Sequence, residues 1–170
     1  MDIAIEGSKL RQALDVVVDQ IDLAVHPHQI ERVDLPPLVC ATFKCLPVAL
    51  GLIWQPGFPK LVSFTQVGAG RFVHWLIAER HLHQQPEITN GCLVLYFAGP
   101  DWRHAGIGLP DGRVVSKWGC NQLLRHPVDQ VPAECGDTVR AYRHPGGARA
   151  LELYHAFVDR ADMSRKSRAK

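Results

Sequence analysis

The chain has 170 residues, of which 46% are hydrophobic and 21% are charged, and its formal net charge is +2. This length is enough for one domain with a hydrophobic core, and the composition is that of an ordinary globular protein. A net charge so close to zero does not indicate a protein that binds nucleic acid. We expect a single domain over residues 1–163, followed by a disordered basic tail over residues 164–170.

We expect no targeting segment in this sequence. Its first residues, MDIAIEGSKLRQ, lack the basic-then-apolar layout of a signal peptide, and no apolar run reaches the about 18 residues that a membrane span needs. The five cysteines form no CxxC pair, and their odd number leaves at least one thiol free, which favours a reducing compartment. We expect a cytoplasmic protein that binds neither membrane nor nucleic acid, with export by a dedicated secretion system left open, and the sequence does not indicate its oligomeric state.

The first part of the chain is predicted to be helical. A helix covers residues 8–24, with Ser8 as its N-cap, and its inward face repeats at steps of four and three. Paired prolines keep the segment VDLPPLVC at residues 33–40 extended. A short buried helix then begins at Cys45, because Pro47 occupies a first turn that tolerates proline.

The second part is rich in strands. Its predicted elements are a helix over 69–82, a central strand over 90–99, hairpin strands over 104–109 and 113–118, a strand over 137–143 and a helix over 146–163. The hairpin turn is Pro110-Asp111-Gly112. This order predicts an α+β domain with N-terminal helices, a small antiparallel sheet and a C-terminal helix.

Two residues suit cysteine-based catalysis. Cys45 begins a helix, where free N–H groups face the sulfur and favour the thiolate, and they could also contribute to an oxyanion hole. His104 stands at the predicted start of a hairpin strand, among small residues, where an imidazole has room to act as a base. We expect the two side chains to lie in contact and the pKa of Cys45 to lie below the about 8.5 of a free thiol.

The segments around Cys45 and His104 resemble those of a known group of enzymes. The hairpin HAGIGLPDGRVVS resembles that of the NlpC-type and CHAP-type cysteine peptidases, and KCLPVALGL resembles their nucleophile helix, with Lys44 and Val48 in place of Asn and an aromatic residue. The similarity covers about residues 40–143. It implies a papain-like fold in which Cys45 is the nucleophile and His104 is the base.

The resemblance also bears on the rest of the site. It places Ser116 at the third catalytic position, where these families have His, Asn or Gln, and Asn121 or His126 remain alternatives for orienting the imidazole. No Gln precedes Cys45 to complete an oxyanion hole, and Thr42 is the nearest polar donor. The residues predicted to line a substrate groove beside the hairpin are Trp102, Gly106 and Trp118. The alternative for the two tryptophans, which their size favours, is that they seal the core there.

These observations favour a cysteine-dependent hydrolase. It would cleave an amide bond of a peptide or protein-conjugate substrate through an acyl-enzyme, without a cofactor. A zinc site is not expected, because the Cys40–Cys45 spacing is too wide and the HPH and HLH motifs lack a cysteine pair. Cys92 is expected to pack in the core, whereas Cys120 and Cys135, like Cys40, have no base at a recognisable spacing. The alternatives are a catalytically inactive papain-like binding module and a thiol-dependent acyltransferase.

Overall fold

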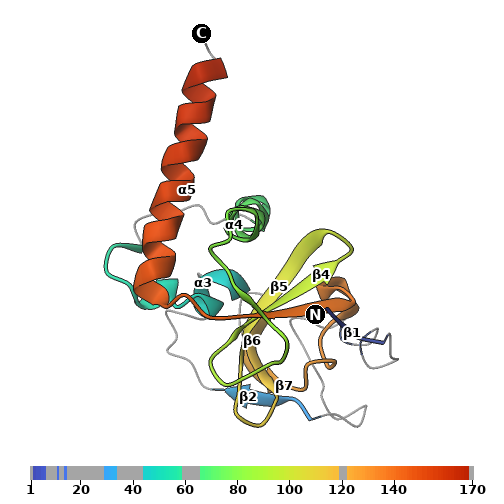
Figure 1. The fold of residues 1–170 in the computed structure, drawn as a ribbon. Helices are drawn as coiled ribbons and strands as arrows, with labels where there is room; N and C mark the ends of the chain where they lie inside the picture. The colour runs from blue at the N-terminus through green and yellow to red at the C-terminus, as the bar shows by residue number, and fades with distance from the viewer. Residues whose placement is uncertain are drawn as a thin grey trace.

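Figure 1 shows the fold of the chain, which is a computed structural model. The structure describes residues 2–6, 11, 14, 29–33, 44–58, 66–118 and 122–168. These residues form three α-helices and an eight-stranded antiparallel sheet, which confirms the predicted α+β class.

The strands are arranged in the order β1-β8-β4-β5-β6-β7-β2, and β3 also pairs with β8. Their bounds are β1 Ile3–Ala4, β2 Glu31–Val33, β3 Gln84–Gln85, β4 Leu93–Ala98, β5 Asp101–Gly108, β6 Val114–Trp118, β7 Gln122–His126 and β8 Thr138–Tyr142. The prediction of a central strand is confirmed, because β4 pairs with both β5 and β8 and is buried along nearly all its length. A continuous apolar run is typical of a strand that is covered on both faces.

The predicted hairpin is formed by β5 and β6. Its turn is closed by a hydrogen bond of 2.8 Å from the Leu109 N–H to the Arg113 carbonyl, and Gly112 has the positive φ of 77° that a glycine adopts without strain. β5 begins at Asp101, three residues before the predicted start, because the β4–β5 turn at Gly99 lets the strand pair with β4 along its whole length.

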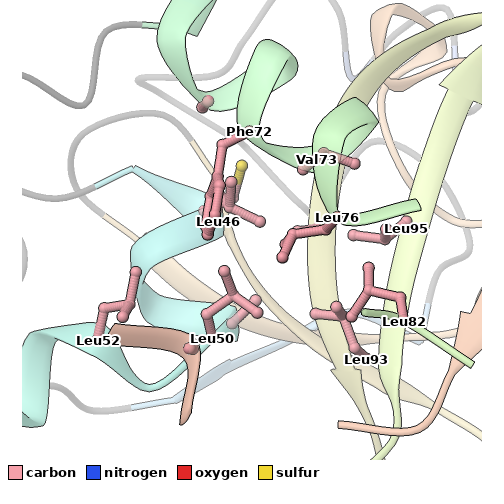
Figure 2. Packing of buried hydrophobic residues seen from close by; sticks show 14 of the residues in the cluster. Leu46, Leu50, Leu52, Phe72, Val73, Leu76, Leu82, Leu93 and Leu95 are labelled. Atoms are coloured by element: carbon pink, nitrogen blue, oxygen red, sulfur yellow. The ribbon is translucent and has the colours of Figure 1, made fainter. Parts of the chain in front are cut away.

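Strand alternation divides the interior into two cores. Leu93, Leu95 and Phe97 of β4 point into the helix-side core, the buried cluster that lies between the sheet and the helices (Figure 2). Val94 and Tyr96 point into the second core, the buried cluster on the other face. Successive side chains of a strand point to opposite faces, so one apolar strand supplies both cores.

The helices that cover the sheet are α3 (Cys45–Ala49), α4 (Gln66–Ala78) and α5 (Gly147–Arg168). The predicted inward face of α4 is largely confirmed, because Phe72, Val73 and Leu76 are buried. The C-terminal part of α5 extends away from the sheet (Figure 1), and the helix includes residues 164–168 of the predicted tail. Within the described helices, none has the length and apolar character required to cross a membrane.

The predicted helix over residues 8–24 lies outside the described residues, apart from Arg11 and Leu14. Both of these are helical and buried, and Arg11 donates a hydrogen bond of 3.1 Å to the carbonyl of Val131. Cys40, Thr42, Cys120 and Asn121 also lie outside the described residues.

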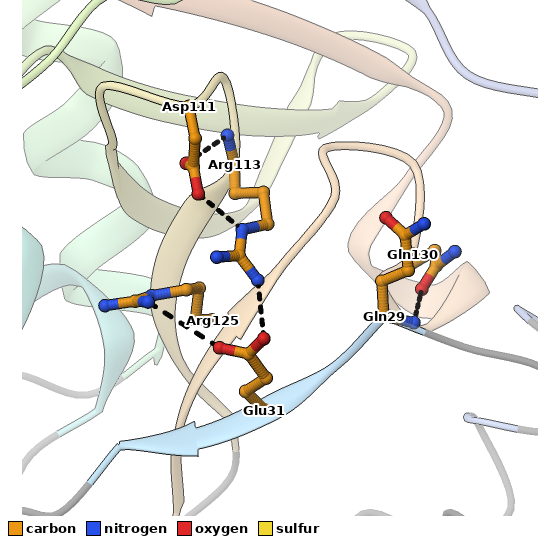
Figure 3. Close-up of polar contacts among 6 residues, drawn as sticks. All are labelled: Gln29, Glu31, Asp111, Arg113, Arg125 and Gln130. Atoms are coloured by element: carbon orange, nitrogen blue, oxygen red, sulfur yellow. Dashed lines mark hydrogen bonds and ion pairs between the residues drawn. The ribbon is translucent and has the colours of Figure 1, made fainter.

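A surface ion-pair cluster joins β2 to the hairpin (Figure 3). The Glu31 carboxylate lies 2.9 Å from a guanidinium nitrogen of Arg113 and 3.6 Å from one of Arg125. Asp111, in the hairpin turn, lies 2.7 Å from the same Arg113 guanidinium. Solvent screens such exposed pairs, so they add little to stability.

Candidate active site

Cys45 begins α3, as predicted, and its side chain is 7% exposed in the helix-side core. The preceding residue, Lys44, has an extended backbone and makes no side-chain cap bond. Pro47 lies in the first helical turn, where the absence of an N–H group costs nothing. α3 is only five residues long, so its dipole is small.

The sulfur of Cys45 lies where the ladder between β5 and β6 ends. The last paired residues are Gly106 and Ser116. The next residue of β5, Ala105, directs its N–H toward β6, because alternate residues of a strand bond to the same neighbour. This N–H donates to the sulfur of Cys45, so the sulfur lies beside the peptide that joins Ala105 to His104.

His104 lies in the middle of β5 and is 6% exposed, whereas the sequence predicts an exposed imidazole at the start of a strand. The difference follows from the early start of β5, which pairs His104 with Tyr96 of the central strand. The two ring centroids are 5.6 Å apart. The imidazole is therefore held by packing as well as by hydrogen bonds.

Ser116 is the centre of a buried polar cluster of four side chains. Its Oγ lies 2.9 Å from Nε2 of His104 and 2.7 Å from Nε2 of His126. The indole N–H of Trp118 donates to the same oxygen at 2.9 Å. The other ring nitrogen of His126, Nδ1, lies 2.8 Å from the carbonyl oxygen of Pro127. Ser116 therefore bonds to His104 directly, whereas His126 is linked to His104 only through Ser116.

Burial sets the charge state of the site. Desolvation raises the pKa of Cys45 to about 11, against a smaller opposing effect of the Ala105 N–H. Desolvation, together with repulsion from His126, lowers the pKa of His104 to about 3. At neutral pH the site thus holds a thiol and an uncharged imidazole. The predicted low thiol pKa is wrong, because loss of hydration outweighs the donors that a five-residue helix offers.

The residues predicted to bind substrate are all buried. Trp102 belongs to the helix-side core and Trp118 to the second core. The register shifts between Tyr96, which pairs with His104, and Phe97, which pairs with Trp102. Trp102 and His104 therefore point to opposite faces although they are two residues apart. The space beside Gly106 is filled by β6 side chains rather than left for a ligand.

Replacing Gly106 with alanine should destabilise the protein by about 1–3 kcal/mol. The added Cβ would lie 2.5 Å from Cγ1 of Val114 and 2.9 Å from both Cβ of Ser116 and the carbonyl oxygen of Val115. Urea denaturation measures the effect. The matched control is Gly70→Ala in α4, where the nearest atom is at an ordinary 3.9 Å and alanine favours the helix by about 0.5–1 kcal/mol. Equal stabilities of the two variants would contradict the tight packing.

In the part of the chain that the structure describes, neither another thiol nor a group of metal ligands extends the site. Cys92 packs in the second core, as predicted, and Cys135 is buried in the same cluster. Among the described residues, no three His, Cys, Asp or Glu side chains are close enough to hold a metal ion.

The hydrogen bond from Trp118 to Ser116 was missed by sequence reasoning. A signal for it was available, because Ser116 and Trp118 are two residues apart on one strand and their side chains share a face. The His126 contact was predicted only as one of three alternatives. Comparisons of the chain with protein-family models, curated proteins and solved structures found no match.

Proposed function

We propose that this protein is a cysteine-dependent hydrolase with a papain-like fold, which cleaves peptide or isopeptide amide bonds through an acyl-enzyme. One observation carries the proposal: the Cys45 sulfur accepts the N–H of Ala105, the residue after His104, while the imidazole of His104 is held by Ser116. In this proposal Cys45 of α3 is the nucleophile, His104 of β5 is the base and Ser116 of β6 is the hydroxyl that orients the imidazole.

The proton starts on the sulfur. Because Nε2 of His104 is engaged by Ser116, Nδ1 is the ring nitrogen that takes the thiol proton as the sulfur attacks the substrate carbonyl carbon. The imidazolium then gives this proton to the departing amine, and the C–N bond breaks to leave a thioester. Water attacks the thioester with His104 again as the base, and the acid and the thiol are released.

The charge state favours proton transfer during the attack over a preformed ion pair. The pKa of Cys45 is raised to about 11 and that of His104 is lowered to about 3 by burial, so a resting thiolate–imidazolium pair is disfavoured. The developing charge on the imidazole is one that Ser116 can stabilise by accepting its Nε2–H.

The test is transfer of an acetyl group from p-nitrophenyl acetate to the full chain. We expect p-nitrophenolate release by the wild type, with the acetyl group trapped on the peptide that contains Cys45. Cys45→Ala and His104→Ala should each lower the rate by about 10²-fold or more. Cys92→Ala is the matched control, since Cys92 is also a buried thiol and should leave the rate unchanged.

The rival is a binding module with the same scaffold, which the near-complete burial of Cys45 and His104 favours. It predicts no acetyl group on Cys45 and equal rates for the wild type and Cys45→Ala. An acyltransferase would acetylate Cys45 as the hydrolase does, but it would release the acyl group faster to an added amine than to water.

A further inference from the structure

We propose that His126 is a positioning residue that, through Ser116, holds His104 in the tautomer with its proton on Nε2 and its lone pair on Nδ1. The catalytic consequence rests on the proposed function, whereas the tautomer itself is a property of the folded chain. Each proton in the cluster can be assigned in turn from the chemistry of the atoms that meet there.

The first assignment is at His126. Its Nδ1 lies 2.8 Å from the carbonyl oxygen of Pro127, and a carbonyl oxygen can only accept a hydrogen bond. Nδ1 of His126 therefore carries a proton. Burial lowers the pKa of His126 to about 4, so at neutral pH the ring carries that one proton and Nε2 is an acceptor.

The second assignment is at Ser116. Its Oγ lies 2.7 Å from Nε2 of His126, so the hydroxyl proton of Ser116 is donated to that nitrogen. The indole of Trp118 can only donate, so Ser116 accepts its N–H. The single proton of the hydroxyl is then used, and the oxygen can only accept from any further partner.

The third assignment follows at His104. Its Nε2 lies 2.9 Å from the Ser116 oxygen, and it must donate, because the oxygen has no second proton to give. The neutral ring of His104 then has its lone pair on Nδ1. This is the tautomer in which Nδ1 can accept a proton from a thiol.

Removing the acceptor nitrogen of His126 should undo this arrangement of protons. The Ser116 hydroxyl would then be free to rotate and donate to Nε2 of His104. The proton of His104 would move to Nδ1, where it blocks the base. His126 thus acts on His104 from two hydrogen bonds away.

Nitrogen-15 imidazole spectra of the full chain at pH 7 test the assignment. For the wild type we expect a protonated Nε2 and an unprotonated Nδ1 on His104. His126→Leu should move the proton of His104 to Nδ1 or give both tautomers. His126→Gln should restore the wild-type pattern, because its amide oxygen can accept from Ser116. His83→Gln, at an exposed position, is the control and should change nothing at His104.

The wild-type spectrum alone can overturn the proposal: a protonated Nδ1 on His104 would do so even if His126→Leu failed to fold. An unchanged His104 in a folded His126→Leu would also overturn it. In the acetate assay, His126→Leu should lower kcat by about 10²-fold at a similar KM, and His126→Gln should recover most of it. If the tautomer is found but Cys45 is never acetylated, the proposed function fails and the assignment stands.

Discussion

Ser116→Ala should lower the free energy of unfolding by about 3–5 kcal/mol, a large part of the about 5–15 kcal/mol that stabilises a typical domain. The hydroxyl bonds to Nε2 of His104, to Nε2 of His126 and to the indole N–H of Trp118. All three side chains are buried, so alanine would leave two donors and one acceptor without partners or water. Urea denaturation followed by tryptophan fluorescence measures the loss.

Thr89→Ala is the control for removing a hydroxyl. Thr89 is exposed, and its hydroxyl lies 3.5 Å from the amide oxygen of Gln85, so its loss should change stability by less than about 0.5 kcal/mol. A Ser116→Ala variant as stable as Thr89→Ala would show that the buried cluster is not held by the serine.

Acidification should destabilise the protein well above the pH at which its carboxylates titrate. Burial lowers the pKa of His104 to about 3 and that of His126 to about 4, against about 6.5 in an unfolded chain. Below pH 6.5 the unfolded chain binds protons at both residues and the folded chain does not. Their contribution is therefore fully present above about pH 6.5 and is lost as the pH falls, by about 1.4 kcal/mol per pH unit for each histidine.

Urea denaturation at half-unit steps between pH 7 and pH 4.5 measures this slope. His83→Gln, which removes an exposed histidine, should leave the slope unchanged. His126→Gln should reduce it by about half, because one of the two buried histidines is removed. A stability that stays constant from pH 6.5 to pH 5 would contradict the neutral buried state of His104 and His126.

The sequence by itself determined the elements whose signals are local. The apolar run of β4, the turn that ends at Gly112, the Pro47 helix start and the inward face of α4 all follow from residues that are close together along the chain. Apolar spacing and turn chemistry act over a few residues, so they can be read without knowing what packs against them. The pairing of Ser116 with the strand of His104 also followed, because the turn between them sets the register.

Only the tertiary structure decided how the site is buried and charged. The register shift in β5 turned Trp102 away from His104, and the segment after Ser116 folded back as β7 to bring His126 to the same oxygen. The pKa of Cys45 is raised by burial, whereas the sequence predicts that it is lowered. Desolvation depends on the atoms that surround a group in space, and those atoms come from strands and helices far apart in the sequence.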